Sequence, residues 1–193
     1  MANYLHEGDL PAGVFDGADS VAVDSETMGL RLGRDPLCVV QLSAGDGDAH
    51  VVRLSRPDYD SPNLKALLTD PKVVKIFHFG RFDIAMFHLH LGVVTAPVYC
   101  TKIASKLART YTDRHGLKDV SKELVGIDMS KAQQSSDWGA ATLSPDQIAY
   151  AASDVLYLHA LRARLDEMLV REGRDRLARA CFDFLPHRAR LDV

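Results

Sequence analysis

Four short runs of apolar residues, rich in β-branched side chains, occupy the first 77 residues and constrain the fold more than any other feature. They are Ser20–Asp24, Leu37–Leu42, Ala49–Leu54 and Val73–Phe77. Short runs of this kind, bounded by turn residues, are typical of buried β-strands. The Gly- and Asp-rich segment 44–48 predicts a hairpin turn between the second and third runs.

Helical spacing of apolar residues dominates the rest of the chain. The predicted helices are Pro62–Leu68, Gly80–Leu91, Thr101–Arg109, Leu117–Leu124, a long helix from Ser144 to about Glu172, and Arg174–Phe184. The long helix opens with a capping-box pattern and a proline at its first position. Strands followed by helices, with no repeat or low-complexity linker, predict a single α/β domain over residues 1–193, with a mixed central sheet flanked by helices.

Composition excludes several classes of protein. Of the 193 residues, 47% are hydrophobic and 25% are charged, which argues against a disordered chain or a coiled coil. The net charge of −3 excludes a protein that holds long nucleic acid on a uniformly basic surface. It does not exclude a nucleic-acid enzyme, because bound divalent metal ions supply positive charge that the composition does not count.

The location of the protein is also suggested by sequence. Three widely spaced cysteines form neither a disulfide framework nor a CxxC zinc site. The first residues lack the pattern of a signal peptide, and no apolar stretch reaches the roughly 20 residues that span a bilayer. We therefore expect a cytoplasmic protein.

Two carboxylates close the first predicted strand. Asp24 and Glu26 are two residues apart, so the period of a strand places both on one face at its carboxyl end. Open α/β sheets build their sites at that end. Taken alone, the pair is explained equally well by a solvated strand end.

Asp83 lies in the first turns of a largely apolar predicted helix, which follows the strand Val73–Phe77. A buried, unpaired carboxylate would be costly there, so a carboxylate that interacts with the helix dipole is the simpler interpretation of Asp83 alone. His78, just before the helix, is more often a hydrogen-bonded core or rim residue than a ligand.

Tyr150 and Asp154 lie at positions i and i+4 of the long predicted helix, so both side chains project from one face. The small residues between them, Ala151, Ala152 and Ser153, allow close packing. Taken alone, this pair is better explained by a core tyrosine with an incidental aspartate.

Together the three segments are far more specific. An Asp-x-Glu strand end, an Asp on a following helix and a late Tyr-x-x-x-Asp resemble the DEDD superfamily of 3′→5′ exonucleases, in its tyrosine-bearing branch. The resemblance extends to the ribonuclease D family over nearly the whole chain. The segments that carry it include Phe77–Asp83, Cys100–Leu107, Arg109–Leu117, Ser130–Trp138 and Leu143–Val155.

This resemblance implies an RNase H-like fold of the DnaQ exonuclease type. It also implies metal-dependent hydrolysis of phosphodiester bonds with two Mg²⁺ or Mn²⁺ ions, which would resolve the repulsion between the clustered carboxylates. The implied metal ligands are Asp24, Glu26, Asp83 and Asp154. Tyr150 completes the implied catalytic set, where its hydroxyl would orient the attacking water and accept its proton.

Substrate contacts are implied as well. The resemblance places them at Thr27, Met28, Gly29 and Leu30, with Leu30 wedged between two bases. His78, Arg81 and Trp138 are further candidates, Trp138 as a stacking face or equally as a core aromatic. A basic rim would comprise Arg81, Lys102, Arg109, Arg114, His115 and Lys118. Phe79 departs from many superfamily members, which have asparagine four residues before the motif aspartate.

The strongest resemblance is to short ribonuclease D relatives that degrade diribonucleotides and very short RNA to 5′-mononucleotides. It implies a homo-oligomer, a ring-shaped octamer, whose neighbouring subunits confine each site. Three alternatives stay open. They are a ribonuclease D-type enzyme that trims longer RNA or tRNA 3′ ends, a related DNA exonuclease, and a noncatalytic nucleic-acid-binding domain.

Overall fold

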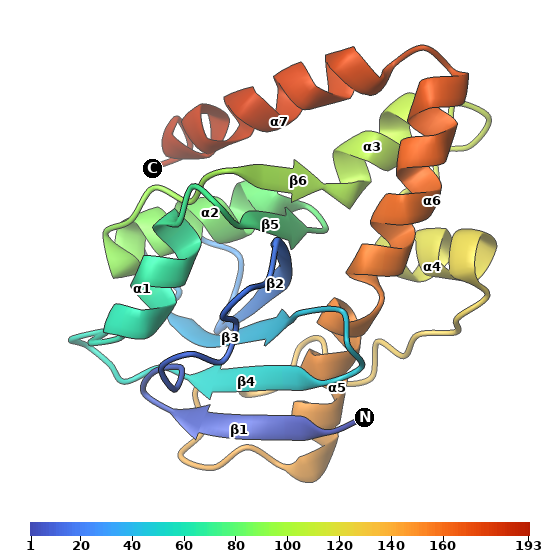
Figure 1. Cartoon of the computed structure of the whole chain (residues 1–193). Helices are drawn as coiled ribbons and strands as arrows, with labels where there is room; N and C mark the ends of the chain where they lie inside the picture. The colour runs from blue at the N-terminus through green and yellow to red at the C-terminus, as the bar shows by residue number, and fades with distance from the viewer.

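A six-stranded mixed sheet forms the centre of the molecule, in a computed structural model that describes all 193 residues (Figure 1). The strand order is β1-β4-β3-β2-β5-β6. Its members are β1 (Asn3–Glu7), β2 (Ser20–Thr27), β3 (Leu37–Ser43), β4 (Ala49–Arg53), β5 (Val74–Phe77) and β6 (Val98–Cys100). The pairs β2–β3 and β3–β4 are antiparallel, whereas β1–β4, β2–β5 and β5–β6 are parallel.

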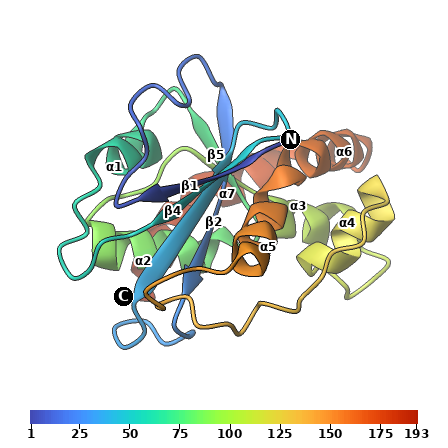
Figure 2. The ribbon, with the colours of Figure 1, turned by 90° about the horizontal axis from the view of Figure 1, so that it is seen from below.

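Seven helices surround this sheet. They are α1 (Pro62–Thr69), α2 (Gly80–Leu91), α3 (Thr101–Ala108), α4 (Leu117–Val125), α5 (Pro145–Leu156), α6 (Leu158–Arg171) and α7 (Asp175–Arg190). None of them combines the length and the apolar character that a bilayer crossing requires. The helices α2 and α5 lie on opposite sides of β2, as the view in Figure 2 shows. This arrangement confirms the predicted α/β fold with a mixed sheet.

Sequence patterns located the interior strands and most helices well, and missed the two strands at the sheet edges. The strand β1 pairs in parallel with β4 and is exposed along most of its length, so it carries no apolar run. The strand β6 has only three residues. Both are strands because a neighbour pairs with them, which is a tertiary effect that local sequence does not encode.

The predicted long helix is wrong, because the chain breaks it at Tyr157 into α5 and α6. The helix α5 packs across β2, β3 and β4, whereas α6 packs against β5, α3 and α4. One straight helix could not cover both surfaces, so the break follows from packing and not from a proline or glycine.

The predicted end of the last helix before Pro186 is also wrong. Instead α7 continues through Pro186 to Arg190. Pro186 lacks the amide hydrogen that would continue the helical ladder, a defect that ordinarily kinks or ends a helix. Here Pro186 is buried together with Leu185 and Ala189, and α7 packs along α2, so tertiary contacts keep the helix continuous.

The capping box at the start of α5 is present as predicted. Ser144 Oγ accepts a hydrogen bond from the Gln147 amide at 3.1 Å, and Gln147 Oε1 accepts one from the Ser144 amide at 2.8 Å. Gln147 Nε2 also donates to Ser136 Oγ and to the Asp137 carbonyl. The cap therefore fixes both the helix start and the preceding loop.

We predict that Ser144→Ala lowers the free energy of unfolding by about 1 kcal/mol, because the helix loses its capping oxygen. In a chain of this size the loss corresponds to a fall in Tm of roughly 2–4 °C. Thermal denaturation followed by circular dichroism measures it, with Ser55→Ala as the control because Ser55 is exposed. Equal Tm values for the two variants would contradict a capping role.

Candidate active site

Three carboxylates meet at the carboxyl end of β2. Side-chain oxygens of Asp24, Glu26 and Asp154 all lie within 4.8 Å of one another. Asp24 and Glu26 are two residues apart on β2 and project from the face that α5 covers. Asp154 comes from α5, so the strand period and the packing of one helix together build the cluster.

Gln41 is a member of this site that the sequence analysis missed. It lies on β3 directly opposite Asp24 and is completely buried. Its Nε2 donates to Asp24 Oδ2 at 3.3 Å and to Glu26 Oε1 at 3.1 Å. The signal was an amide side chain within the apolar run Leu37–Leu42, a residue type that is seldom buried without a polar partner.

Asp83 reaches the site from the other side of β2. Ser25 points away from Asp24 and Glu26, and its hydroxyl donates to Asp83 Oδ1 at 2.5 Å. Asp83 is 4% exposed in the first turn of α2. The same cavity is lined by all four carboxylates, so the structure brings together the acidic residues that the sequence pattern grouped.

Burial and mutual repulsion raise the pKa values of these carboxyl groups. Burial raises the pKa of Asp24 to about 7, against hydrogen bonds that lower it. The pKa of Asp154 is raised by burial and then by the charge of Asp24. For Glu26 and Asp83, burial is again the largest cause, followed by the charge of Asp24. The cluster therefore resists full ionisation unless cations neutralise it.

Tyr150 stands beside the acidic cluster. It lies one helical turn before Asp154, and both residues line two adjoining cavities of about 380 and 240 Å³. Burial, followed by the charges of Asp154, Glu26 and Asp24, raises the pKa of Tyr150. The expected shared face of Tyr150 and Asp154 is thus observed.

The two cavities differ in chemistry. The larger one contains the four carboxylates with Leu30, Phe79 and Phe82. The smaller one shares Asp24 and Asp154, and its lining also includes three lysines, Lys102, Lys118 and Lys131. A third cavity, of about 470 Å³ between segment 10–19 and α1, contains no such cluster of ligating groups.

Residues 27–30 form a preorganised turn at the mouth of the larger cavity. Thr27 Oγ1 donates to the Gly29 carbonyl at 2.5 Å. A Cβ on Gly29 would come within 2.3 Å of Asp35 Oδ2, so only glycine fits against this carboxylate. Leu30 is 81% exposed and lines the cavity, so its side chain is free to contact another molecule there.

His78 lies at the border of both cavities, but protein groups occupy its two ring nitrogens. Nδ1 is 2.8 Å from Thr101 Oγ1, and Nε2 is 2.9 Å from the His115 carbonyl. Burial lowers the pKa of His78 to about 4, so the ring is neutral and Nε2 donates to that carbonyl. His78 therefore connects the start of α2 to the segment before α4.

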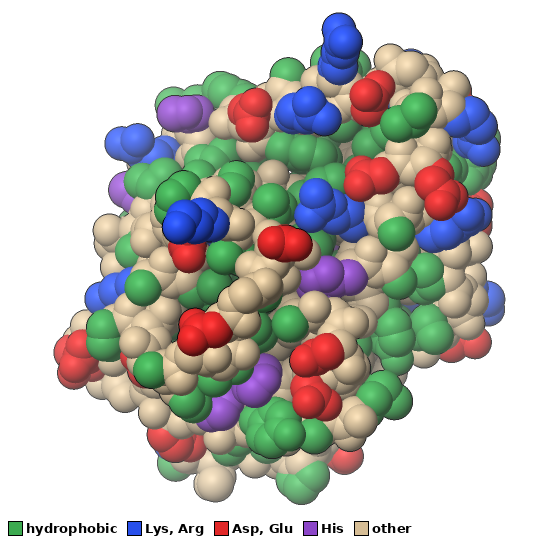
Figure 3. Space-filling model, viewed as in Figure 1, with side chains coloured by type: hydrophobic (Ala, Val, Ile, Leu, Met, Phe, Trp, Pro, Cys, Tyr) green, Lys and Arg blue, Asp and Glu red, His purple; other side chains and the backbone are tan.

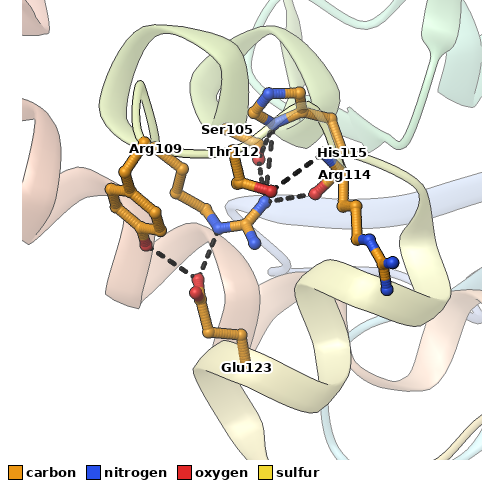
Figure 4. A network of polar contacts seen from close by, with 7 residues as sticks. Ser105, Arg109, Thr112, Arg114, His115 and Glu123 are labelled. Atoms are coloured by element: carbon orange, nitrogen blue, oxygen red, sulfur yellow. Dashed lines mark hydrogen bonds and ion pairs between the residues drawn. The ribbon is translucent and has the colours of Figure 1, made fainter.

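Arg109, expected in the basic rim, is instead the centre of a buried network (Figure 4). Its Nε donates to Glu123 Oε2 at 2.5 Å, and its Nη1 donates to Ser105 Oγ and to the Arg114 carbonyl. Ser105 Oγ in turn lies 2.7 Å from His115 Nδ1. This network fixes the segment whose carbonyl holds His78.

The structure gives two of the candidate substrate contacts other partners. Trp138 is 1% exposed and packs with Leu143 and Ala151, behind the Tyr150 ring at a centroid distance of 6.0 Å, so no base can stack on it. Arg81 lies outside the lining of both cavities, where Asp192 accepts two hydrogen bonds from its guanidinium at 2.6 and 2.8 Å. Their structural partners could not be located from local sequence.

Comparison with known proteins identifies the family. Residues 14–170 match a family model described as 3′-5′ exonuclease. The chain belongs to the 3′-5′ exonuclease family. It is 54% identical to Brucella melitensis NrnC in a structure bound to pGG, with a TM-score of 0.96 over 100% of this chain and 93% of that one. A structure of the same protein with bound Mg²⁺ gives 53% identity and a TM-score of 0.95, over 100% and 94% of the two chains.

Within the family, the chain is a member of the ribonuclease D group and is similar to NrnC, or nano-RNase C. This confirms the resemblance to the ribonuclease D family that the sequence motifs indicate. It is 40% identical to ribonuclease D of Gluconacetobacter diazotrophicus over 154 residues, which are 80% of this chain and 39% of that protein. The chain thus spans about 40% of the length of the ribonuclease D proteins that it matches. DnaQ-like exonucleases use divalent metal ions, and this chain has the corresponding acidic cluster.

We predict that, without divalent metal, wild-type Tm falls as pH rises from about 4 to 8. Asp24 has a folded pKa near 7, above its unfolded value, so its stabilising proton is held at low pH and lost as pH rises through 7. Asp24→Asn cannot lose that proton and shows a smaller fall, measured by scanning calorimetry in EDTA. Adding Mg²⁺ at pH 8 raises the Tm of wild type more than that of the variant. Identical pH profiles for the two proteins would show that folding does not raise the pKa of Asp24.

Proposed function

We propose that this protein is a metal-dependent 3′-5′ exoribonuclease that hydrolyses diribonucleotides and very short RNA to 5′-mononucleotides. The acidic cluster at the end of β2, with Tyr150 beside it, is the observation that carries the proposal. The match to NrnC bound to pGG over the whole chain supports a short substrate. A cytoplasmic location and assembly into a homo-oligomer, a ring-shaped octamer, belong to the same proposal.

The donor set fits divalent metal ions. Three carboxylates present oxygens within 4.8 Å of one another, and hard cations such as Mg²⁺ and Mn²⁺ prefer oxygen ligands. Asp24, Glu26, Asp83 and Asp154 are proposed to hold two such ions. When bound, the ions supply Lewis-acid polarisation of the phosphoryl group and make water acidic enough to be a nucleophile at neutral pH.

The protein's own residues orient the reactants. Hydrogen bonds from Gln41 fix the positions of the Asp24 and Glu26 carboxylates, and a hydrogen bond from Ser25 fixes that of Asp83. The carboxylates therefore need little rearrangement before reaction. Tyr150 is proposed to hold the attacking water and to take part in its proton transfer, because it lies one helical turn from Asp154 and lines both cavities.

Substrate recognition follows the division between the two cavities. Thr27–Leu30 are proposed to contact the terminal bases, with Leu30 between them. Lys102, Lys118 and Lys131 place positive charge beside the acidic cluster, where a short substrate's phosphates can interact with it. On the face shown in Figure 3, basic and acidic side chains are interspersed, so that face offers no continuous track for a long backbone.

We predict that Tyr150→Phe lowers kcat by about 10²- to 10⁴-fold and leaves KM nearly unchanged, because only a hydroxyl beside the water is removed. Steady-state kinetics on a dinucleotide measures the effect, with Tyr157→Phe as the matched control from the end of the same helix. An effect confined to KM would assign Tyr150 to substrate binding instead.

We predict that kcat/KM is higher for a diribonucleotide than for RNA of five or more nucleotides, because few cationic contacts are available to a longer backbone. Initial rates over a series of 5′-labelled RNAs, with Mg²⁺ or Mn²⁺ in excess, test this. Asp24→Asn serves as the inactive control for a contaminating nuclease.

Other outcomes of that series select the alternatives. A kcat/KM that rises steadily with length favours a ribonuclease D-type enzyme that trims longer RNA. Faster hydrolysis of DNA oligonucleotides would favour a DNA exonuclease. Binding without metal-dependent turnover would indicate a noncatalytic nucleic-acid-binding domain.

A further inference from the structure

Two residues other than glycine adopt a left-handed backbone conformation, Tyr59 with φ of 49° and Phe79 with φ of 63°. This conformation is unfavourable for bulky side chains and persists only where the surrounding structure requires it. Tyr59 has a structural reason, because its ring is 6% exposed and its hydroxyl donates to the Leu37 carbonyl at 2.9 Å. Phe79 is 47% exposed and has no polar atom in its side chain, so core packing explains its conformation far less well.

The position of Phe79 suggests a reason. It is the residue before α2, four positions from Asp83, and it lines the cavity that contains all four carboxylates. Leu30 and Phe82 line the same cavity, so Phe79 adds to an apolar wall beside the acidic cluster. The left-handed conformation thus keeps an aromatic ring at the cavity and partly in solvent.

Lys102 leaves only one face of the Phe79 ring open to a ligand. Its Nζ lies 4.3 Å from the centroid of the Phe79 ring, a cation–π geometry. Lys102 also lines the smaller, cationic cavity, so the pair stands where the two cavities adjoin. The ammonium group occupies one face of the ring, and a flat ligand can contact only the other face.

We propose that Phe79 is a stacking platform for one nucleobase of the bound substrate, an inference that rests on the proposed function. Nucleobases stack on aromatic rings irrespective of sequence, which suits an enzyme that must accept any short RNA. Contact with Lys102 also restricts the ring, so the ring loses less freedom on binding. Phe79 is therefore a residue that determines substrate affinity, beside but distinct from the acidic groups.

A coupling experiment between protein and substrate tests the proposal. Phe79→Leu keeps an apolar side chain but removes the aromatic face, and Phe184→Leu is the control, because Phe184 is 53% exposed on α7. Each protein is assayed on a diribonucleotide and on two analogues that lack either the 5′ or the 3′ base. We expect Phe79→Leu to lower kcat/KM on the intact dinucleotide by about 5- to 100-fold, the effect typical of a lost base–aromatic stack.

The analogues distinguish stacking from a general disturbance of the site. If Phe79 stacks on a base, removal of that base makes wild type and Phe79→Leu nearly equal, while the other analogue keeps the difference. An equal loss on all three substrates would overturn the proposal, and so would an unchanged kcat/KM on the intact dinucleotide. Failure of wild type to hydrolyse the dinucleotide would instead contradict the proposed function.

A second variant tests whether the backbone holds the ring at this position. Asparagine tolerates positive φ better than phenylalanine, so Phe79→Asn loses the ring and also relieves strain. We expect its Tm to exceed that of Phe184→Asn by about 2–4 °C, although both variants lose a half-exposed ring. It nevertheless shows the same loss of kcat/KM on the dinucleotide as Phe79→Leu. A Tm below that of Phe184→Asn would mean that the ring serves the fold and would overturn the proposal.

Discussion

Repulsion among clustered, partly buried carboxylates is the constraint around which this molecule is organised. Asp24, Glu26 and Asp154 present oxygens within 4.8 Å of one another, and burial raises the pKa values of all three. No lysine or arginine forms an ion pair with them. Only Gln41 and Ser25 provide neutral hydrogen bonds to the acidic groups. The free energy to hold such a cluster must come from elsewhere in the fold, and a core of 38 buried apolar residues is the available source.

The two faces of β2 explain how the cluster is assembled without an opposing charge. The alternation of the strand directs Asp24 and Glu26 toward α5, while Ser25 turns the other way toward α2 and Asp83. Each helix therefore contributes one carboxylate from its own side of the sheet. Gln41 supports the carboxylates of β2, and the His78, Thr101 and His115 contacts connect the start of α2 to the segment before α4. A change in either helix would shift one carboxylate relative to the others.

Sequence alone predicted the parts of this arrangement that depend on local periodicity. The spacing of Asp24 and Glu26, and of Tyr150 and Asp154, fixes which side chains share a face, and both expectations agree with the structure. The glycine after α2, Gly92, has a φ of 67°, which a glycine adopts readily and which ends the helix at the predicted residue Leu91. What could not be predicted depends on packing between distant segments. The break at Tyr157, the helix that passes through Pro186, and the burial of Trp138 behind Tyr150 all belong to this class.

The candidate substrate contacts that lie away from the cavities have a common physical cause. Arg81, Arg109 and Trp138 were candidates for contact with the substrate, Trp138 equally as a core aromatic, because arginine and aromatic side chains are typical of nucleic-acid-binding surfaces. In the fold, Arg81 and Arg109 donate hydrogen bonds to Asp192 and Glu123. Trp138 packs in the core around Ala151. The lysines Lys102 and Lys118 were assigned on the same grounds, and they do line a cavity. Arginine forms bidentate pairs with carboxylates more readily than lysine does. An arginine at the rim is therefore more readily held in an ion pair with a carboxylate of the same chain. In this protein, the cationic groups left free to meet a phosphate beside the acidic cluster are therefore lysines.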